Sequence, residues 1–410
     1  MAHWYGNDRI ETDITVGYAD VDGKPATTSR DTPTISFAQV RTYPFVNASD
    51  PAGTPLCSPD LELQAPVGSY QFLQTSGIAP RTPTITPITL PIDPLLPLTD
   101  LIVRDGIAYV SADSSVSSDP DLIIADIHDP HHPTVSSSLN TGPGIDGIAL
   151  AGNHIFAAAS SAAAELHVIR LTSQSSPLSP TAALAKKYRL PLPQASTSPP
   201  LGSSISYNKG TVYLGTDKWD GSEFAVIDVS SSEDPVQVGG FETGSKVNSI
   251  SIRNGTAYVA DSDQAQLRVL DVNVRTTPRL LYSFSPSGWQ RQTGETSSVF
   301  EDSLVFGRTS GGFDIPTDLE SFAWPISVPT STPPFALNVS GGVYGLVADR
   351  HHVYAATRTN GQEFSVYDRS LATATAAHYP LPVAPQTITC DEDKLYILAH
   401  TAPVIYQVSF

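Results

Sequence analysis

A short motif that ends in an aromatic residue recurs seven times along the chain, and this repeat constrains the fold more than any other feature. In each copy a turn residue stands three positions before the aromatic, and small or apolar residues follow it. The aromatics lie 42 to 57 residues apart, close to the roughly 40–50 residues of a four-stranded propeller blade. They are Tyr109, Phe156, Tyr213, Tyr258, Phe306, Tyr354 and Tyr396.

Apolar segments on both sides of each motif complete the pattern of a blade. A short apolar stretch such as residues 101–103 precedes the motif, and a polar loop and a second apolar run such as Leu122–Asp126 follow it. Short strands bounded by Gly, Pro, Asn and Ser indicate an all-β protein. The sequence therefore predicts an all-β fold, a seven-bladed β-propeller with an N-terminal extension that contains strands.

The second apolar runs carry a family resemblance. Residues 224–238 read Phe-Ala-Val-Ile-Asp-Val-Ser-Ser-Ser-Glu-Asp-Pro-Val-Gln-Val and are similar to the LVIVD repeat of bacterial and archaeal surface propellers, as are residues 122–133. The resemblance covers about residues 98–410 and implies a propeller at the cell surface, but no catalytic residues. In the clearest copies the apolar run ends in an Asp, and a Pro follows seven residues later. Two copies depart from this pattern, with Arg170 in place of the Asp and Thr375 in place of the Pro.

The last repeat sets the domain boundaries. Residues 386–410 provide three strands, so we expect residues 84–90, just before the first repeat, to supply the fourth. Closing a propeller with strands from both chain ends removes exposed strand edges. The propeller would then span residues 81–410. Residues 1–80, with candidate strands at 12–18, 34–40 and 70–73, have few apolar runs and are expected to pack on it.

Composition narrows the range of partners. The chain has 41 acidic and 23 basic residues, a net charge of −18, which argues against binding to nucleic acid or to anionic membranes. No run of 18 apolar residues occurs, so no membrane span is expected. Only 16% of residues are charged, and the abundance of Ser, Thr, Pro and Gly is common in exported proteins. We therefore expect a secreted or cell-surface protein whose export segment or anchor has been removed; a natural cytosolic start is the alternative.

Two further features concern cross-links and cofactors. Cys57 and Cys390 are predicted to form a disulfide, because two cysteines in a chain of extracellular composition usually pair; two unrelated buried thiols are the alternative. No cofactor is expected. Calcium is the one weak candidate, because Asp20-Val-Asp22-Gly23 resembles the start of a calcium loop. It lacks the later ligands, and Asp-Gly is an ordinary hairpin turn.

The start of each innermost strand offers a candidate binding site. Positions nine and ten before each aromatic fall at one mouth of the central tunnel, and every pair there has a hydrogen-bonding side chain. The pairs are Thr99-Asp100, Asp146-Gly147, Ser203-Ser204, Asn248-Ser249, Thr296-Ser297, Tyr344-Gly345 and Gln386-Thr387. We take Asp100, Asp146, Asn248, Tyr344 and Gln386 as candidate ligand-binding residues. A wet tunnel mouth that is polar in any case is the alternative.

The loops between the second and third strands should open on the same face. Three candidates lie there: Asp217, Trp219 and Asp261. Trp219 is flanked by charges, which favours an exposed platform of the kind that binds sugars and proteins. A buried loop anchor is the alternative.

No catalytic signature is present: there is no Gly-x-Ser-x-Gly, His-Glu-x-x-His or Cys-x-x-Cys. We therefore expect a non-enzymatic propeller that binds a glycan, a small polar ligand or a protein partner at the tunnel mouth. Two alternatives remain open. One is a hydrolase or lyase that uses Asp100 and Asp146 as a carboxylate pair. The other is a structural protomer of a surface assembly.

Overall fold

The structure is a computed structural model that describes part of the chain. It describes residues 2–5, 9–12 and 82–410, apart from 115, 117, 174–179, 194–198, 232, 264, 285–292, 301–302, 310–318, 324–334, 340, 350–351, 369–375 and 392. The chain divides into two units, residues 1–54 and 55–410. In the first, β1 (Ala2–Tyr5) and β2 (Arg9–Thr12) form an antiparallel hairpin that the sequence patterns did not predict. The expected strands at 34–40 and 70–73, and all but Thr12 of that at 12–18, lie outside the described residues.

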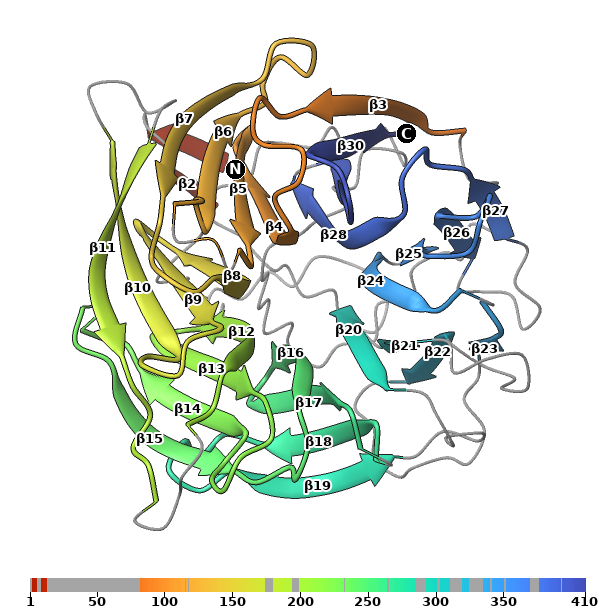
Figure 1. Cartoon of the computed structure of the whole chain (residues 1–410). Helices are drawn as coiled ribbons and strands as arrows, with labels where there is room; N and C mark the ends of the chain where they lie inside the picture. The colour runs from red at the N-terminus through yellow and green to blue at the C-terminus, as the bar shows by residue number, and fades with distance from the viewer. Residues whose placement is uncertain are drawn as a thin grey trace, which may run out of the picture. The chain divides into compact units, whose positions relative to one another are not determined.

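The second unit contains seven four-stranded antiparallel sheets, which confirms the seven-bladed propeller (Figure 1). Blade 1 is β4 (Leu98–Arg104), β5 (Ile107–Ala112), β6 (Leu122–Asp126) and β7 (Thr134–Leu139). Blade 2 is β8 (Ile145–Ala151), β9 (His154–Ala159), β10 (Leu166–Ser173) and β11 (Pro180–Tyr188). Blade 3 is β12 (Gly202–Asn208), β13 (Thr211–Thr216), β14 (Phe224–Asp228) and β15 (Val236–Phe241). Blade 4 is β16 (Val247–Arg253), β17 (Thr256–Asp261), β18 (Leu267–Asp271) and β19 (Arg279–Phe284).

Three more blades close the ring. Blade 5 is β20 (Gly294–Phe300), β21 (Ser303–Arg308), β22 (Leu319–Ala323) and β23 (Phe335–Leu337). Blade 6 is β24 (Val343–Ala348), β25 (His352–Thr357), β26 (Phe364–Asp368) and β27 (Ala376–Tyr379). Blade 7 is β28 (Pro385–Asp391), β29 (Lys394–Ala399), β30 (Val404–Ser409) and β3 (Thr84–Thr89). Each innermost strand contacts the next, from β4 through β28 and back to β4. Among the described residues no helix is long and apolar enough to cross a membrane.

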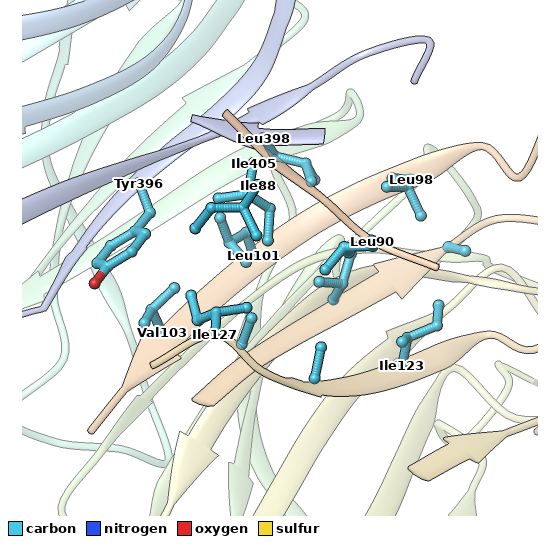
Figure 2. Close-up of a cluster of buried hydrophobic side chains, with 14 of the residues drawn as sticks. Ile88, Leu90, Leu98, Leu101, Val103, Ile123, Ile127, Tyr396, Leu398 and Ile405 are labelled. Carbon is cyan, nitrogen blue, oxygen red and sulfur yellow. The ribbon is translucent and has the colours of Figure 1, made fainter. Parts of the chain in front are cut away.

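Blade 7 is closed by strands from far apart in the sequence, as predicted. β3 pairs antiparallel with β30, from Thr84 opposite Ser409 to Thr89 opposite Val404. Pro87 fits here because the outer edge of a blade does not need its missing N–H. The seam with blade 1 is apolar: Figure 2 shows Ile88 and Leu90 among side chains from β4, β6, β29 and β30. Ile88 and Leu90 are at most 1% exposed, so the closing strand contributes to the core as well as to the hydrogen bonds.

The turns between third and fourth strands are regular. The carboxylates of Asp126, Asp228 and Asp271 each accept the backbone N–H two residues later, at 3.0, 2.8 and 3.0 Å. This is the Asx turn that a short side-chain acceptor favours. Each of these turns runs from its Asp to a Pro seven residues later, at Pro133, Pro235 and Pro278. A repeated local hydrogen bond of this kind suits a structural role for these Asp-to-Pro turns.

Buried carboxylates also join the blades to their connections, and the sequence analysis missed them. Asp121, Glu165, Glu223 and Glu363 stand just before a third strand and are at most 8% exposed. Each accepts a backbone N–H from the segment that leads to the next blade; for Glu223 the donors include Thr243 at 2.8 Å. Buried polar groups need such partners, so these acids are structural.

The predicted disulfide has one half in the described structure. Cys390 lies near the end of β28, opposite Leu395 of β29, at the end of the blade away from the start of β28. Cys57 lies outside the described residues, so the pairing stays a prediction. We expect no reactive thiol when the protein is denatured without reductant and treated with a thiol reagent. Two reactive thiols would contradict it.

Candidate functional site at the tunnel mouth

A β-bulge interrupts the first strand of every blade near its start. In all seven blades the pairing between first and second strands shifts by one residue there. A bulge leaves its extra residue unpaired and re-aims the side chain, often beside a functional site. The residues left unpaired are Thr99 with Asp100, Asp146, Ser203, Asn248, Glu295, Tyr344 and Gln386. All of them line one cavity of about 480 Å³.

Five predicted residues therefore meet in this cavity: Asp100, Asp146, Asn248, Tyr344 and Gln386. Whether they bind a ligand is a separate question. Their convergence follows from the ring, because each innermost strand starts at the same mouth and each bulge presents one side chain. Volumes of about 300–1,000 Å³ are typical of small-molecule sites.

Glu295 was missed because in blade 5 the aromatic residue lies one position later in the second strand than in the other blades. The hairpin pairs Phe300 with Ser303, as Arg253 pairs with Thr256 in blade 4. The residue equivalent to Tyr258 is therefore Val305, not the aromatic Phe306. Counting ten positions back from residue 305 would have found Glu295.

The loops between second and third strands rise around the same opening, as predicted. Just after its second strand, blade 3 donates the Asp217 N–H to Leu201 O at 2.9 Å, beside the start of its first strand. The Asp217 carboxylate pairs with the Lys246 ammonium at 3.2 Å. Lys246 lines the cavity, so Asp217 lies at its rim. Lys246 was not predicted.

Trp219 is not an exposed platform, which corrects the prediction. Its side chain is 8% exposed and packs in the core between blades 2 and 3 with Phe156 and Leu214. Gly221 makes room for it, because a Cβ at that position would lie 2.5 Å from the indole Cζ2. The alternative of a buried loop anchor describes Trp219, and flanking charges were a poor guide because only the neighbours point to solvent.

Asp261 does not reach the cavity either. It is fully buried, and its Oδ2 accepts the Arg268 Nε–H at 2.6 Å. Burial raises the pKa of Asp261 even though the Asp263 N–H and Arg268 act to lower it. Asp261 thus lies inside blade 4, paired with Arg268, and not among the residues that line the cavity.

The two acids of blades 1 and 2 are held in unfavourable surroundings. The Asp100 carboxylate accepts the Leu101 N–H at 2.8 Å and, across the blade interface, the Ile148 N–H at 3.0 Å. Burial raises its pKa to about 6 despite both hydrogen bonds. Burial, and then the negative charge of Asp113, raise the pKa of Asp146 to about 6 as well. Ionised acids that destabilise a fold are typical of functional sites.

On the far side of the cavity the positive and negative charges are better balanced. Burial raises the pKa of Glu295, while the Arg358 and Lys246 charges act in the opposite direction. The Arg358 guanidinium lies 3.7 Å from the centre of the Tyr344 ring and donates to Gln386 Oε1 at 2.8 Å. Arg358 thus fixes the positions of two cavity residues.

No group of three or more His, Cys, Asp and Glu in the described part of the chain could hold a metal ion. The calcium candidate, Asp20 and Asp22, lies outside that part.

The raised pKa of Asp146 predicts a pH dependence of stability. Between its ordinary value of 3.8 and about 6, the folded protein binds more protons than the unfolded chain. The contribution of Asp146 to the free energy of unfolding should therefore fall as pH rises through this range and level off above it. Asp146→Asn should remove part of this fall and raise the free energy of unfolding near pH 7 by roughly 1–2 kcal/mol. Denaturant unfolding across this pH range measures it, with the exposed Asp234→Asn as control. An unchanged pH profile would contradict the prediction.

Comparison with known proteins supports the fold and does not assign a family. No family model matches the chain, and no curated protein matches it. Among solved structures, a chain of the Mitotic Checkpoint Complex is 11% identical with a TM-score of 0.56, covering 83% of this chain and 99% of its own. The computationally designed Ika8 protein is 14% identical with a TM-score of 0.52 and coverage of 75% and 82%. The WD40 β-propeller domain of Doa1 is 8% identical with a TM-score of 0.50 and coverage of 77% and 93%. These likenesses show the propeller fold alone.

Proposed function

We propose that this protein is a non-enzymatic propeller that binds a polar ligand, a glycan end or small polar molecule, in the tunnel-mouth cavity. The observation that carries the proposal is that seven bulges, one from each blade, direct unpaired residues into a single cavity. A bulge weakens its ladder, yet every blade has one here, and each directs a polar or acidic residue to the tunnel mouth. Function is commonly added to a rigid scaffold in this way.

The location and family remain part of the proposal. The Ser-, Thr- and Pro-rich composition and the LVIVD-like segments support a secreted or cell-surface propeller. A protein partner remains compatible with the same face, and the net charge of −18 still argues against nucleic acid.

A hydrolase or lyase is the second candidate, since two carboxylates with raised pKa values lie in one cavity. Acid–base chemistry works best when the environments of the two carboxyl groups separate their pKa values, so that one donates a proton while the other stays ionised. The pKa values of Asp100 and Asp146 are both raised to about 6, mainly by burial. Because burial is the largest cause for both groups, their surroundings do not distinguish an acid from a base, which favours binding over catalysis.

A glycan array tests the proposed function. We expect the protein to bind some of the arrayed sugars, and Ser249→Trp to abolish that binding by filling the cavity that Ser249 lines. The melting temperature of Ser249→Trp checks that the fold survives. Binding that persists in a folded Ser249→Trp variant would place the ligand elsewhere.

A further inference from the structure

The charges around the cavity are unevenly distributed. Its lining includes three carboxylates, Asp100, Asp146 and Glu295, and one ammonium, that of Lys246. Lys246 is already paired with Asp217 at 3.2 Å. Arg358 and Lys246 offset the charge of Glu295. Lys246 also acts on Asp146, but no cation acts on Asp100, so the less compensated negative charge lies on the side formed by blades 1 and 2.

Asp100 and Asp146 belong to adjacent blades that meet at a tight interface. The Thr99 hydroxyl donates to Ile145 O at 2.6 Å, and Asp100 accepts the Ile148 N–H. These contacts bring the start of β4 against β8 at Asp146. Neither carboxylate forms an ion pair with a Lys, Arg or His of the described residues. Asp100 accepts hydrogen bonds from backbone donors, and the Lys246 charge acts on Asp146 from a greater distance than an ion pair. The protein thus leaves two acids of one cavity wall without a cation.

Taking the proposed function as its basis, we propose that the ligand carries a protonated amine together with several hydroxyl groups, as an amino sugar does. The amine binds at the wall formed by Asp100 and Asp146. Its N–H groups donate to the carboxylate oxygens, and hydrogen bonds to ionised acceptors are about twice as strong as neutral ones. The ligand supplies the positive charge that the protein lacks there.

The rest of the lining fits the hydroxyl groups of such a ligand. Hydroxyl and amide side chains line the remainder of the cavity, and these both donate and accept hydrogen bonds. They include Ser203, Asn248, Ser249, Thr296 and Thr387. A bare metal ion fits less well, because no three acidic or His side chains of the described chain come together as ligands. An amine needs fewer carboxylates and can be held by one or two of them.

The pKa values of these acids provide a further prediction of the same inference. Binding an amine requires ionised carboxylates, and both titrate at about 6. The charged groups that act on Asp146 are Asp113, Asp217 and Lys246, and Ser160 donates to it; Asp100 is met by the Leu101 and Ile148 N–H groups. Affinity for an amine should therefore fall between about pH 7 and pH 5, whereas affinity for a neutral sugar should not.

Two disaccharides that differ in their amines test the inference. The full chain is titrated calorimetrically with the glucosamine disaccharide, which has free amines, and with its di-N-acetylated form, which has none. We expect the amine form to bind about tenfold more tightly near pH 7. Asp146→Asn should weaken this preference, and the double variant Asp100→Asn/Asp146→Asn should remove it. Asp234→Asn, which makes the same charge change on an exposed turn, should retain it.

The outcomes separate the inference from the proposed function. Equal binding of both disaccharides, lost in Ser249→Trp, would overturn the amine and keep the cavity as the binding site. A preference that survives in the double variant Asp100→Asn/Asp146→Asn would also overturn the inference, because the amine would then bind elsewhere. If neither disaccharide binds, the inference that the ligand is an amino sugar is overturned. The glycan array would still decide whether the cavity binds any sugar.

Discussion

Replacing Trp219 by alanine is expected to lower the free energy of unfolding by about 3–5 kcal/mol, the usual loss for a large buried aromatic. The indole packs between blades 2 and 3 and is only 8% exposed. Removing it leaves a cavity that the sheets on either side cannot close without losing their own contacts. Denaturant unfolding of purified protein measures the effect.

Trp219→Phe is the matched control for this change. The indole Nε1–H has no hydrogen-bond partner among the described residues, so phenylalanine loses packing volume and no hydrogen bond. We expect a loss well below that of Trp219→Ala, and unchanged ligand binding in both variants because Trp219 does not line the cavity. A Trp219→Ala protein with unaltered stability and weakened binding would restore the exposed platform that the sequence suggested.

Replacing Arg268 by methionine is expected to cost about 3–5 kcal/mol, because it leaves a buried carboxylate without its partner. Arg268 donates to Asp261 Oδ2 at 2.6 Å, to Thr243 O at 2.8 Å and to Asp263 at 3.1 Å. Asp261 is fully buried, so no water replaces the lost donors. The double variant Asp261→Asn/Arg268→Met should recover part of the stability, since the amide carries no charge.

Arg279→Met provides the comparison in the same blade. Arg279 pairs with Asp271 at 2.9 Å, but its side chain is 72% exposed. Exposed ion pairs contribute about 0–1 kcal/mol to stability, so the free energy of unfolding of this variant should be close to that of the parent protein. Equal losses for Arg268→Met and Arg279→Met would show that burial does not set the strength of these pairs.

Much of the fold could be predicted because a propeller repeats itself. The spaced aromatics gave the number of blades, and the missing fourth strand of blade 7 gave the role of residues 84–90. The repeat also located the tunnel mouth, since the distance from the aromatic to the strand start is nearly constant. It failed in blade 5, where Val305 takes the place of the aromatic and the count shifts away from Glu295.

The rest depended on contacts between blades, which no local pattern shows. Trp219 is surrounded in sequence by Lys218 and Asp220 and is buried by residues from another blade. Asp261 lies in a polar loop context, yet Arg268, seven residues later, covers it. The same holds for the pKa of Asp100, which depends on blade 2 lying against its carboxylate. Such effects arise from how strands stack, not from their order.

The most direct test of the central claim is a crystal structure of the protein with the tightest ligand from the glycan array. We predict ligand density in the tunnel-mouth cavity, in contact with Asp100 or Asp146 and with Asn248. Density on the opposite face, at the Asp-to-Pro turns that begin at Asp126, Asp228 and Asp271, would contradict this account.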